Sequence, residues 1–126
     1  LKGNQIRAGQ IIYVKTKGKK NRAVPITEKL QAELPSSRKA LPLFKPCYSA
    51  FRKAMQRAGI ETPAGQLTHV LRHTFASHFM MNGGNILVLQ RILGHTDIKV
   101  TIRYAHFAPD HLSEALKFNP LELAES

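Results

Sequence analysis

The sequence predicts a mostly helical domain with a small antiparallel β-sheet at its N-terminal end, which is an α+β fold class. Two short runs within the first 26 residues are rich in β-branched and aromatic side chains and flank a glycine-containing turn. From residue 48 onward apolar residues recur at helical spacing, and Gly, Pro and Asn divide this part into segments of helical length. A chain of 126 residues has the usual size of one domain, with a hairpin expected at about 10–26, helices at about 48–118 and a tail at 119–126.

The N-terminal segment is expected to form a β-hairpin. The runs Gln10–Thr16 (QIIYVKT) and Arg22–Ile26 (RAVPI) have the composition of strands, and Lys17–Asn21 (KGKKN) between them contains a turn glycine. Lys2–Ile6 is expected to add an earlier strand. Together these segments predict a small sheet that precedes the helices.

Two helices are expected next along the chain. Thr27 is a suitable N-cap for the helix TEKLQAELP, which Pro35 ends. After a loop with three prolines between positions 35 and 46, Tyr48–Ala58 has helical periodicity, and Gly59 suits the left-handed position that follows a helix. The residues expected on the apolar face of this second helix are Phe51, Met55 and Ala58.

A longer helix is expected from Thr68 to the stop signal Asn82-Gly83-Gly84. Asn85 can then cap the helix ILVLQRIL, which ends at Gly94. In the longer helix, an apolar stripe with a spacing of four residues is expected to face the core; it consists of Leu71, Phe75 and Phe79.

Two short helices are expected to complete the chain. Thr96 or Asp97 begins the first, and Tyr104 lies at its far end. Asp110 can cap the second, HLSEALKF, which Asn119-Pro120 ends. The apolar residues expected on one side of each helix are Ile98 and Ile102 in the first, and Leu112 and Leu116 in the second.

The charge is concentrated in one half of the chain. Residues 1–60 contain 14 basic and 2 acidic side chains, whereas residues 61–126 contain 5 basic and 6 acidic ones. Concentrated positive charge neutralises phosphates and releases their counterions, which favours a nucleic acid over a membrane surface or an acidic protein as the partner. From charge alone, a solvated basic face stays open as the alternative.

The single cysteine, Cys47, excludes an internal disulfide framework. No apolar run approaches the roughly 20 residues that a membrane-spanning helix needs. The cytoplasm is therefore the expected compartment, and no membrane partner is expected. Because the sequence begins at Leu1 and opens directly on strand-like residues, it is expected to be a fragment of a longer protein.

Two residues in the segment THVLRH have the chemistry of a phosphate site. On a helix that begins at Thr68, His69 and Arg72 are three positions apart and share a face in the first turn. The helix dipole favours an anion there, Arg72 can hold it with two hydrogen bonds, and a neutral His69 can accept a proton. A capping or surface pair is the alternative explanation for these two residues.

The order of further motifs gives these residues a context. HxxRH is followed by LGH at His95, and Tyr104 stands nine residues later, after a basic hairpin at the N-terminal end. The strings LTHVLRHTFASHFMMNGG, LQRILGHTDIKVTIRYAHFAP and TKGKKNRAVPI resemble the signature of the tyrosine recombinases, in the phage integrase branch. The resemblance covers nearly the whole chain and implies the DNA breaking-rejoining fold of a catalytic domain, here without its N-terminal part.

The resemblance implies a role for each matching residue. Lys17 protonates the leaving 5′ oxygen, His69 is the acid/base histidine, Arg72 is the second phosphate-binding arginine, His95 occupies the third motif, and Tyr104 is the nucleophile. DNA binding is expected from the hairpin residues Lys15, Lys19, Lys20 and Arg22. The family's first arginine has no match, since it belongs upstream of the first strand and Arg7 lies too far into the strand region.

The implied reaction explains the need for these residue types. A phenolate attacks a backbone phosphorus, and fixed cations and N–H donors stabilise the charge that develops on the nonbridging oxygens. The resulting 3′-phosphotyrosyl ester keeps the energy of the phosphodiester, so neither ATP nor a metal cofactor is expected. A zinc site at His69 and His73 is disfavoured because no third ligand appears at a known spacing. The remaining histidines are expected to be supporting or surface groups: His73, His78, His106 and His111.

The predicted function is that of a site-specific recombinase or integrase acting on double-stranded DNA, as a homotetramer when full length. Two alternatives stay open: a topoisomerase-like enzyme that nicks and closes DNA as a monomer, and a noncatalytic DNA-binding module. The chain alone is expected to bind DNA weakly and to be inactive because the first arginine is absent. Its exposed first strand or C-terminal helix is expected to self-associate.

Overall fold

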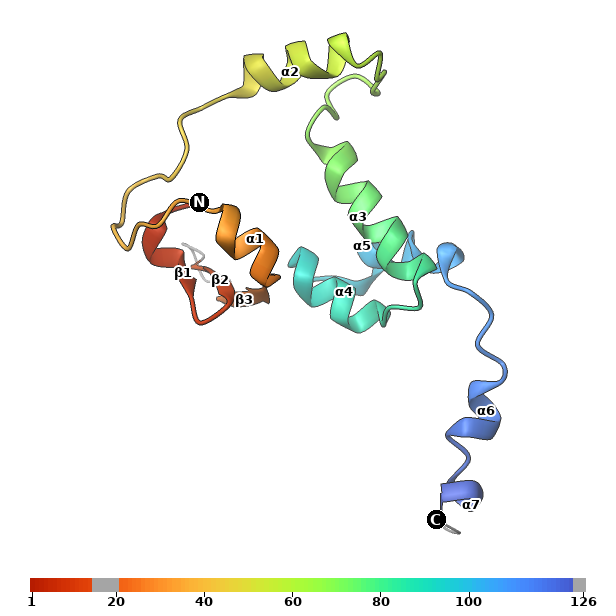
Figure 1. Cartoon of the computed structure of the whole chain (residues 1–126). Coiled ribbons are helices and arrows are strands. Elements are labelled where there is room, and N and C mark those ends of the chain that lie inside the picture. Colours follow the sequence, from red (N-terminus) through yellow and green to blue (C-terminus); the bar gives the residue numbers. More distant parts are fainter. Residues whose placement is uncertain (15–20, 124–126) are drawn as a thin grey trace. The chain divides into compact units, whose positions relative to one another are not determined.

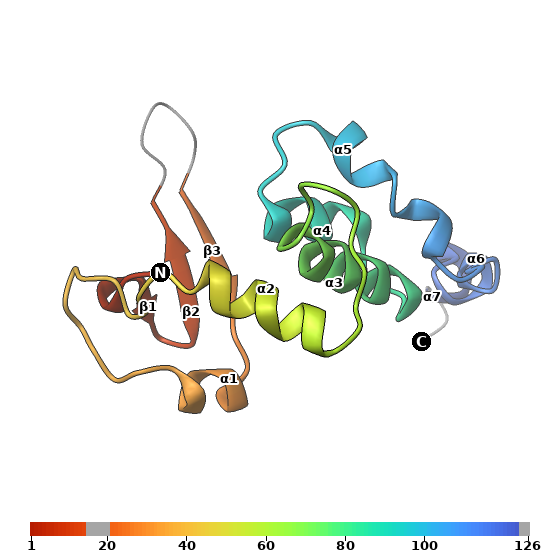
Figure 2. The ribbon, with the colours of Figure 1, turned by 90° about the horizontal axis from the view of Figure 1, so that it is seen from above.

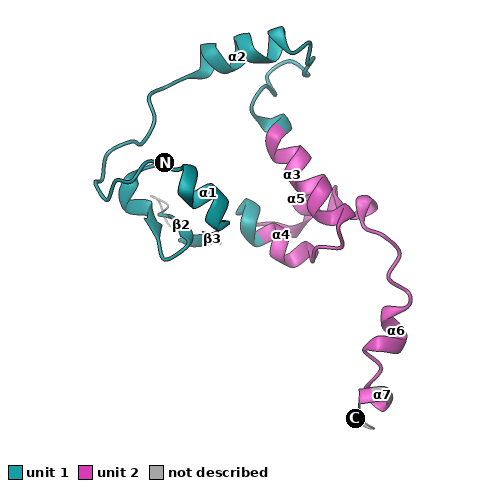
Figure 3. Ribbon diagram, viewed as in Figure 1, with its two compact units in different colours: residues 1–70, 91–94 teal, residues 71–90, 95–126 magenta. Residues whose placement is uncertain are grey.

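The computed structural model describes residues 1–14 and 21–123. The chain divides into two compact units, residues 1–70 with 91–94 and residues 71–90 with 95–126 (Figure 3). In the described part the α-helices and strands, in chain order, are β1 (Ile6–Arg7), β2 (Gln10–Tyr13), β3 (Arg22–Pro25), α1 (Glu28–Glu33), α2 (Tyr48–Arg57), α3 (His69–Met81), α4 (Ile86–Leu93), α5 (Ile98–Ile102), α6 (Glu114–Lys117) and α7 (Pro120–Leu123) (Figure 1).

The sheet of the first unit is antiparallel, with its three strands in the order β1-β2-β3 (Figure 2). β2 and β3 pair from Gln10 opposite Pro25 to Tyr13 opposite Arg22, which confirms the predicted hairpin with shorter strands. Ala8 and Gly9 join β1 to β2, and both have positive φ, as in a two-residue type I′ turn.

The strand predicted at Lys2–Ile6 is wrong for its central residues, although Lys2 is extended and forms an isolated antiparallel bridge with Pro42. A 3₁₀-helix spans Gly3–Gln5 instead, and β1 begins only at Ile6. The side chain of Gln5 accepts a hydrogen bond from the backbone N–H of Lys2 at 2.7 Å, and this local bond bends the chain. Gly3 also passes so close to the backbone of Ser37 that a Cβ would lie 2.3 Å from its oxygen.

The first unit contains the two helices predicted after the sheet. The hydroxyl of Thr27 accepts the backbone N–H of Leu30 at 3.1 Å and begins α1. In α2, Met55 is buried, and Gly59 adopts a φ of 66° just beyond the helix. The predicted signals for the ends of these helices are therefore confirmed.

The second unit contains most of α3 and α4, and all of α5, α6 and α7 (Figure 3). Asn85 and Asp97 cap α4 and α5 as predicted, because their side chains accept backbone N–H groups of the first turn. The stripe predicted to face the core is wrong: Leu71 and Phe75 are 58% and 48% exposed. Among the residues of this unit that the structure describes, the buried ones are Ala76, Met80, Leu89, Thr101 and Tyr104.

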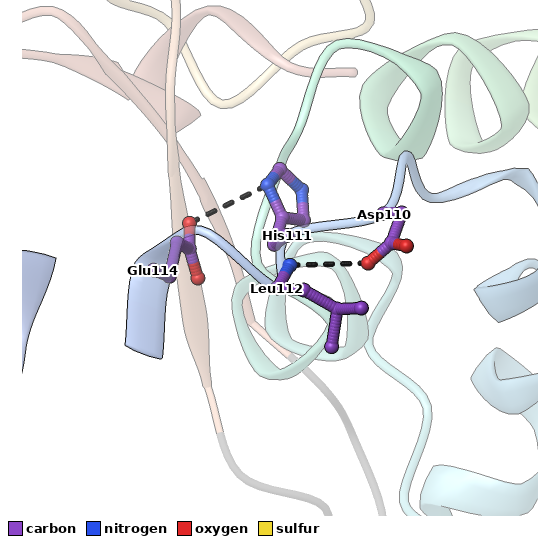
Figure 4. Close-up of polar contacts among 4 residues, drawn as sticks. All are labelled: Asp110, His111, Leu112 and Glu114. Carbon is purple, nitrogen blue, oxygen red and sulfur yellow. Dashed lines mark hydrogen bonds and ion pairs between the residues drawn. The ribbon is translucent and has the colours of Figure 1, made fainter. Parts of the chain in front are cut away.

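The C-terminal segment differs from the single helix predicted after Asp110. The carboxylate of Asp110 accepts the N–H of Leu112 at 3.0 Å, and Nδ1 of His111 lies 3.4 Å from Oε1 of Glu114 (Figure 4). The helix α6 nevertheless begins only at Glu114. α6 ends at Lys117, and Asn119 then accepts the N–H of Leu121 at 3.1 Å at the start of a separate helix, α7, whose first residue is Pro120. The predicted apolar residues Leu112 and Leu116 are 78% and 72% exposed.

Candidate active site

The predicted site residues fall into three groups. Arg72, His95 and Tyr104 belong to the second unit. His69 is the first residue of α3 and belongs to the first unit, and so does Arg22 at the start of β3. The remaining predictions, Lys15, Lys17, Lys19 and Lys20, lie outside the described residues.

Arg72 and His95 are in contact although they are far apart in the sequence. Nη2 of Arg72 lies 3.2 Å from Nε2 of His95, and Nδ1 of His95 lies 2.7 Å from the hydroxyl oxygen of Thr101. A guanidinium group has no acceptor, so Nε2 of His95 accepts the first hydrogen bond. The ring proton of a neutral His95 then lies on Nδ1 and is donated to Thr101. The three side chains form one chain of directed hydrogen bonds.

Thr101 connects His95 to the predicted nucleophile. Its side chain is fully buried, and its backbone oxygen accepts the N–H of Tyr104 at 3.0 Å. Both contacts arise because Asp97 starts α5 four residues before Thr101 and the helix ends one residue after it. Thr101 thus orients the His95 ring with its hydroxyl and the Tyr104 backbone with its carbonyl.

The phenol of Tyr104 is buried and has a specific partner. Only 5% of the residue is exposed, and its hydroxyl is hydrogen-bonded to Nδ1 of His73 on α3. The ring centroids of His73 and Tyr104 are 5.9 Å apart. Because a buried hydroxyl needs a hydrogen-bond partner, His73 keeps the Tyr104 side chain in one orientation. The sequence prediction treated His73 only as a supporting or surface group.

The backbone that leads into His95 is also well ordered by hydrogen bonds. The N–H of His95 donates to the carbonyl of Gln90 at 3.1 Å, and the Gln90 side chain donates to the carbonyl of His95 at 3.2 Å. Both polar groups of the His95 backbone are therefore held by one residue of α4. This leaves the imidazole positioned by Arg72 on one side and by Thr101 on the other.

Arg22, which the sequence predicts to bind DNA, contacts other residues of the first unit in the structure. Its Nη1 donates to the carbonyl oxygen of Leu93, the last residue of α4, at 2.9 Å. Its guanidinium carbon lies 4.7 Å from the ring centroid of Tyr13. Arg22 is thus engaged within the first unit.

The arrangement of the second unit suits an anion such as a phosphate diester. Arg72 supplies a permanent positive charge with several N–H donors, and His95 supplies an imidazole beside it. A phosphate oxygen can replace His95 as a partner of Arg72, after which Nε2 of a protonated His95 can donate to the same phosphate. Within residues 1–14 and 21–123, no group of three or more His, Cys, Asp or Glu side chains is placed to hold a metal ion.

Comparison with known proteins identifies the family of this sequence. Residues 1–111 match the phage integrase family. The chain belongs to this family. It is 67% identical to the integrase of Escherichia phage 186 and 60% identical to that of Haemophilus phage HP1, in each case over 96% of this chain. It is also 33% identical, over 86% of its length, to the tyrosine recombinase XerD of Rhizobium meliloti.

A solved structure supports the same assignment. The catalytic domain of bacteriophage HP1 integrase superposes with a TM-score of 0.87 at 60% identity, covering 96% of this chain and 71% of that one. The predicted family and α+β fold are therefore confirmed. The chain spans only about a third of the two phage integrases, 36% and 35% of their lengths.

None of the described helices is long and apolar enough to span a membrane.

Proposed function

We propose that this chain carries the nucleophile and part of the phosphate-binding site of a site-specific DNA recombinase that cleaves and rejoins double-stranded DNA. The observation that carries the proposal is the contact between Arg72 and His95, joined through Thr101 to the buried Tyr104. This cluster puts a fixed cation, an imidazole and a phenol in one compact unit. Those are the groups that attack on a phosphodiester requires.

In the proposed reaction, the phenolic oxygen of Tyr104 forms a bond to phosphorus while the bond from phosphorus to the 5′ oxygen breaks. Arg72 and His95 stabilise the negative charge on the nonbridging oxygens. His69 takes part in proton transfer from the phenol, and Lys17 protonates the leaving 5′ oxygen. The 5′ hydroxyl of another strand then reverses the attack and restores a phosphodiester, so no ATP is consumed.

The decisive experiment traps the covalent intermediate. The full-length protein is incubated with a nicked suicide duplex, from which cleavage releases a short fragment that carries the 5′ hydroxyl. Because this fragment diffuses away, the strand cannot be rejoined, and a denaturing gel detects protein joined to DNA. We expect a covalent complex attached through Tyr104. Relaxation of supercoils without recombinant products would instead favour a nicking and closing enzyme. Binding without any covalent complex would favour a noncatalytic DNA-binding module.

The number of copies that act together on DNA follows from the reaction. We propose that the full-length protein acts in the cytoplasm as a tetramer on two DNA duplexes, because exchange between two duplexes involves four strands and each copy supplies one nucleophile. Exposed leucines on and beside the short helices α6 and α7 support contacts between copies: Leu112, Leu116, Leu121 and Leu123. The native mass of the protein on paired DNA sites measures the number of copies.

The predicted hairpin lysines provide a test that separates binding from cleavage. Each phosphate contact contributes about −0.9 to the slope of log affinity against log salt concentration. Changing Lys19 and Lys20 to Ala should weaken DNA binding and flatten this slope, whereas Lys17→Ala should reduce cleavage more than binding. The measurements are salt titrations of affinity and single-turnover cleavage rates. Equal effects of all three changes on both readouts would contradict a catalytic role for Lys17.

The 126-residue polypeptide by itself is expected to bind DNA weakly and to form no covalent complex. It has no match for the family's first arginine, so one side of the developing charge lacks a bidentate cation. Losing a comparable arginine costs about 10³ to 10⁵ in phosphoryl-transfer rate. Covalent capture on suicide DNA, with the full-length protein run at the same salt concentration, measures the difference. Efficient capture by the short polypeptide would disprove this expectation.

A further inference from the structure

Arg22 is the first residue of β3 and pairs with Tyr13, the last residue of β2, at the end of the β2–β3 pairing. Its guanidinium carbon lies 4.7 Å from the Tyr13 ring centroid, a distance at which a cation is attracted to an aromatic face. Its Nε is buried and has no hydrogen-bond partner among the described residues. The side chain is therefore packed along the sheet and directed toward a specific contact.

That contact is the C-terminal end of α4. Nη1 of Arg22 donates to the carbonyl oxygen of Leu93 at 2.9 Å. The last carbonyls of a helix have no partner within the helix, and they lie at the negative end of its dipole. A guanidinium ion satisfies both conditions, because it donates a hydrogen bond and brings a permanent positive charge.

Gly94 provides the space for this contact. A Cβ at position 94 would lie 1.3 Å from Nη1 of Arg22 and 2.5 Å from its guanidinium carbon, so no side chain fits while Arg22 stays in place. The φ of Gly94 is 71°, a conformation that L-residues rarely adopt. The φ of this position therefore favours glycine, and the contact between Arg22 and Leu93 can keep this geometry only while position 94 has no Cβ.

The same turn carries the backbone of His95. The N–H of Gly94 donates to Arg91, and the N–H of His95 donates to Gln90, which together form a Schellman motif at the end of α4. Leu93 is the last helical residue before this motif, and its carbonyl is the one that Arg22 holds. Any shift of this turn changes the starting point of the chain at His95.

We propose that Arg22 is a positioning residue that fixes the end of α4, and with it His95, rather than a residue that binds DNA phosphate. The inference rests on the proposed function of His95. It accounts for the glycine before His95, for the burial of Nε, and for the position of the guanidinium group over the Tyr13 ring. A phosphate-binding arginine would instead need its donors accessible to the DNA, whereas Nε of Arg22 is buried and its Nη1 is bonded to Leu93.

The test on the full-length protein compares Arg22→Ala with Lys19→Ala, a matched loss of one positive charge from the same predicted hairpin. We expect Arg22→Ala to slow single-turnover cleavage by up to about 100-fold at saturating DNA, since a misplacement of 1 Å can cost that much. Its salt slope of DNA binding should equal that of wild type, whereas Lys19→Ala should flatten the slope by about 0.9. Arg22→Lys, which can still donate to Leu93, should recover part of the cleavage rate.

The proposal would be overturned if Arg22→Ala flattened the salt slope of DNA binding as much as Lys19→Ala does, or if it left the cleavage rate unchanged.

A double-mutant cycle with Gly94→Ala tests the contact itself by denaturant unfolding and needs no DNA. Gly94→Ala should lower the unfolding midpoint less in the Arg22→Ala background, because the clash with the guanidinium is gone. Additive effects would also overturn the proposal. If wild type forms no covalent complex, the proposed function fails, and the cycle still decides whether Arg22 and Gly94 are coupled.

Discussion

Tyr104→Phe in the full-length protein should abolish covalent capture of DNA while leaving DNA affinity within a factor of about two of wild type, since no charge is lost. The phenolic oxygen is the atom that would join phosphorus, and phenylalanine has no substitute for it. The ring itself remains to fill the buried site, which is only 5% exposed. Suicide DNA with a denaturing gel measures the covalent product, and a salt titration measures the affinity.

The hydroxyl of Tyr104 is also a structural group, so the loss of its hydrogen bond to His73 must be separated from the loss of chemistry. That bond is worth about 1 kcal/mol of folding stability, which a denaturant titration measures. Tyr48→Phe makes the same chemical change on α2, where the residue is 61% exposed, and should cleave at the wild-type rate. If Tyr104→Phe still captured DNA, another residue would have to be the nucleophile.

The ends of the helices could be predicted from the sequence because they depend on local chemistry. Thr27, Asn85 and Asp97 all accept backbone N–H groups in the first turn of their helices. Gly59 and Gly94 both adopt positive φ where a helix ends. In each case the deciding interaction lies within a few residues, so no knowledge of the tertiary structure is needed.

The buried face of α3 could not be predicted in the same way. Leu71 and Phe75 have the right spacing for a core stripe, yet the residues of α3 that are buried are Ala76 and Met80. Periodicity shows that a helix has apolar faces, but the neighbouring elements decide which of them is covered. A small residue such as Ala76 lets a neighbour approach closely, and this advantage does not appear in a hydrophobicity pattern.

The candidate site was partly visible in the order of motifs. That order singled out Arg72, His95 and Tyr104, and the structure brings the first two into direct contact. The contacts of His73 and Thr101 depend on residues 31 and 6 positions away, and periodicity carries no signal for such pairs. A threonine three residues before the expected nucleophile and a second histidine beside Arg72 were the available signals.

Arg72→Ala should reduce the single-turnover cleavage rate of the full-length protein by about 10³ to 10⁵ at saturating DNA, the range found when an arginine that stabilises phosphoryl transfer is lost. The guanidinium group is the fixed cation of the cluster, and alanine leaves neither charge nor donor. His95 also loses the hydrogen bond that Arg72 donates to its Nε2. The defect should therefore be in the rate of cleavage far more than in affinity.

Two further variants test why an arginine is needed at position 72. Arg72→Lys keeps the charge but loses the planar pair of donors, so its cleavage rate should lie between those of Arg72→Ala and wild type. Arg91→Ala removes one positive charge from an exposed position on α4, and its rate at saturating DNA should stay near wild type. A rate for Arg72→Ala within tenfold of wild type would mean that the developing charge is stabilised elsewhere. In that case the contact between Arg72 and His95 would hold the histidine in place without touching the phosphate.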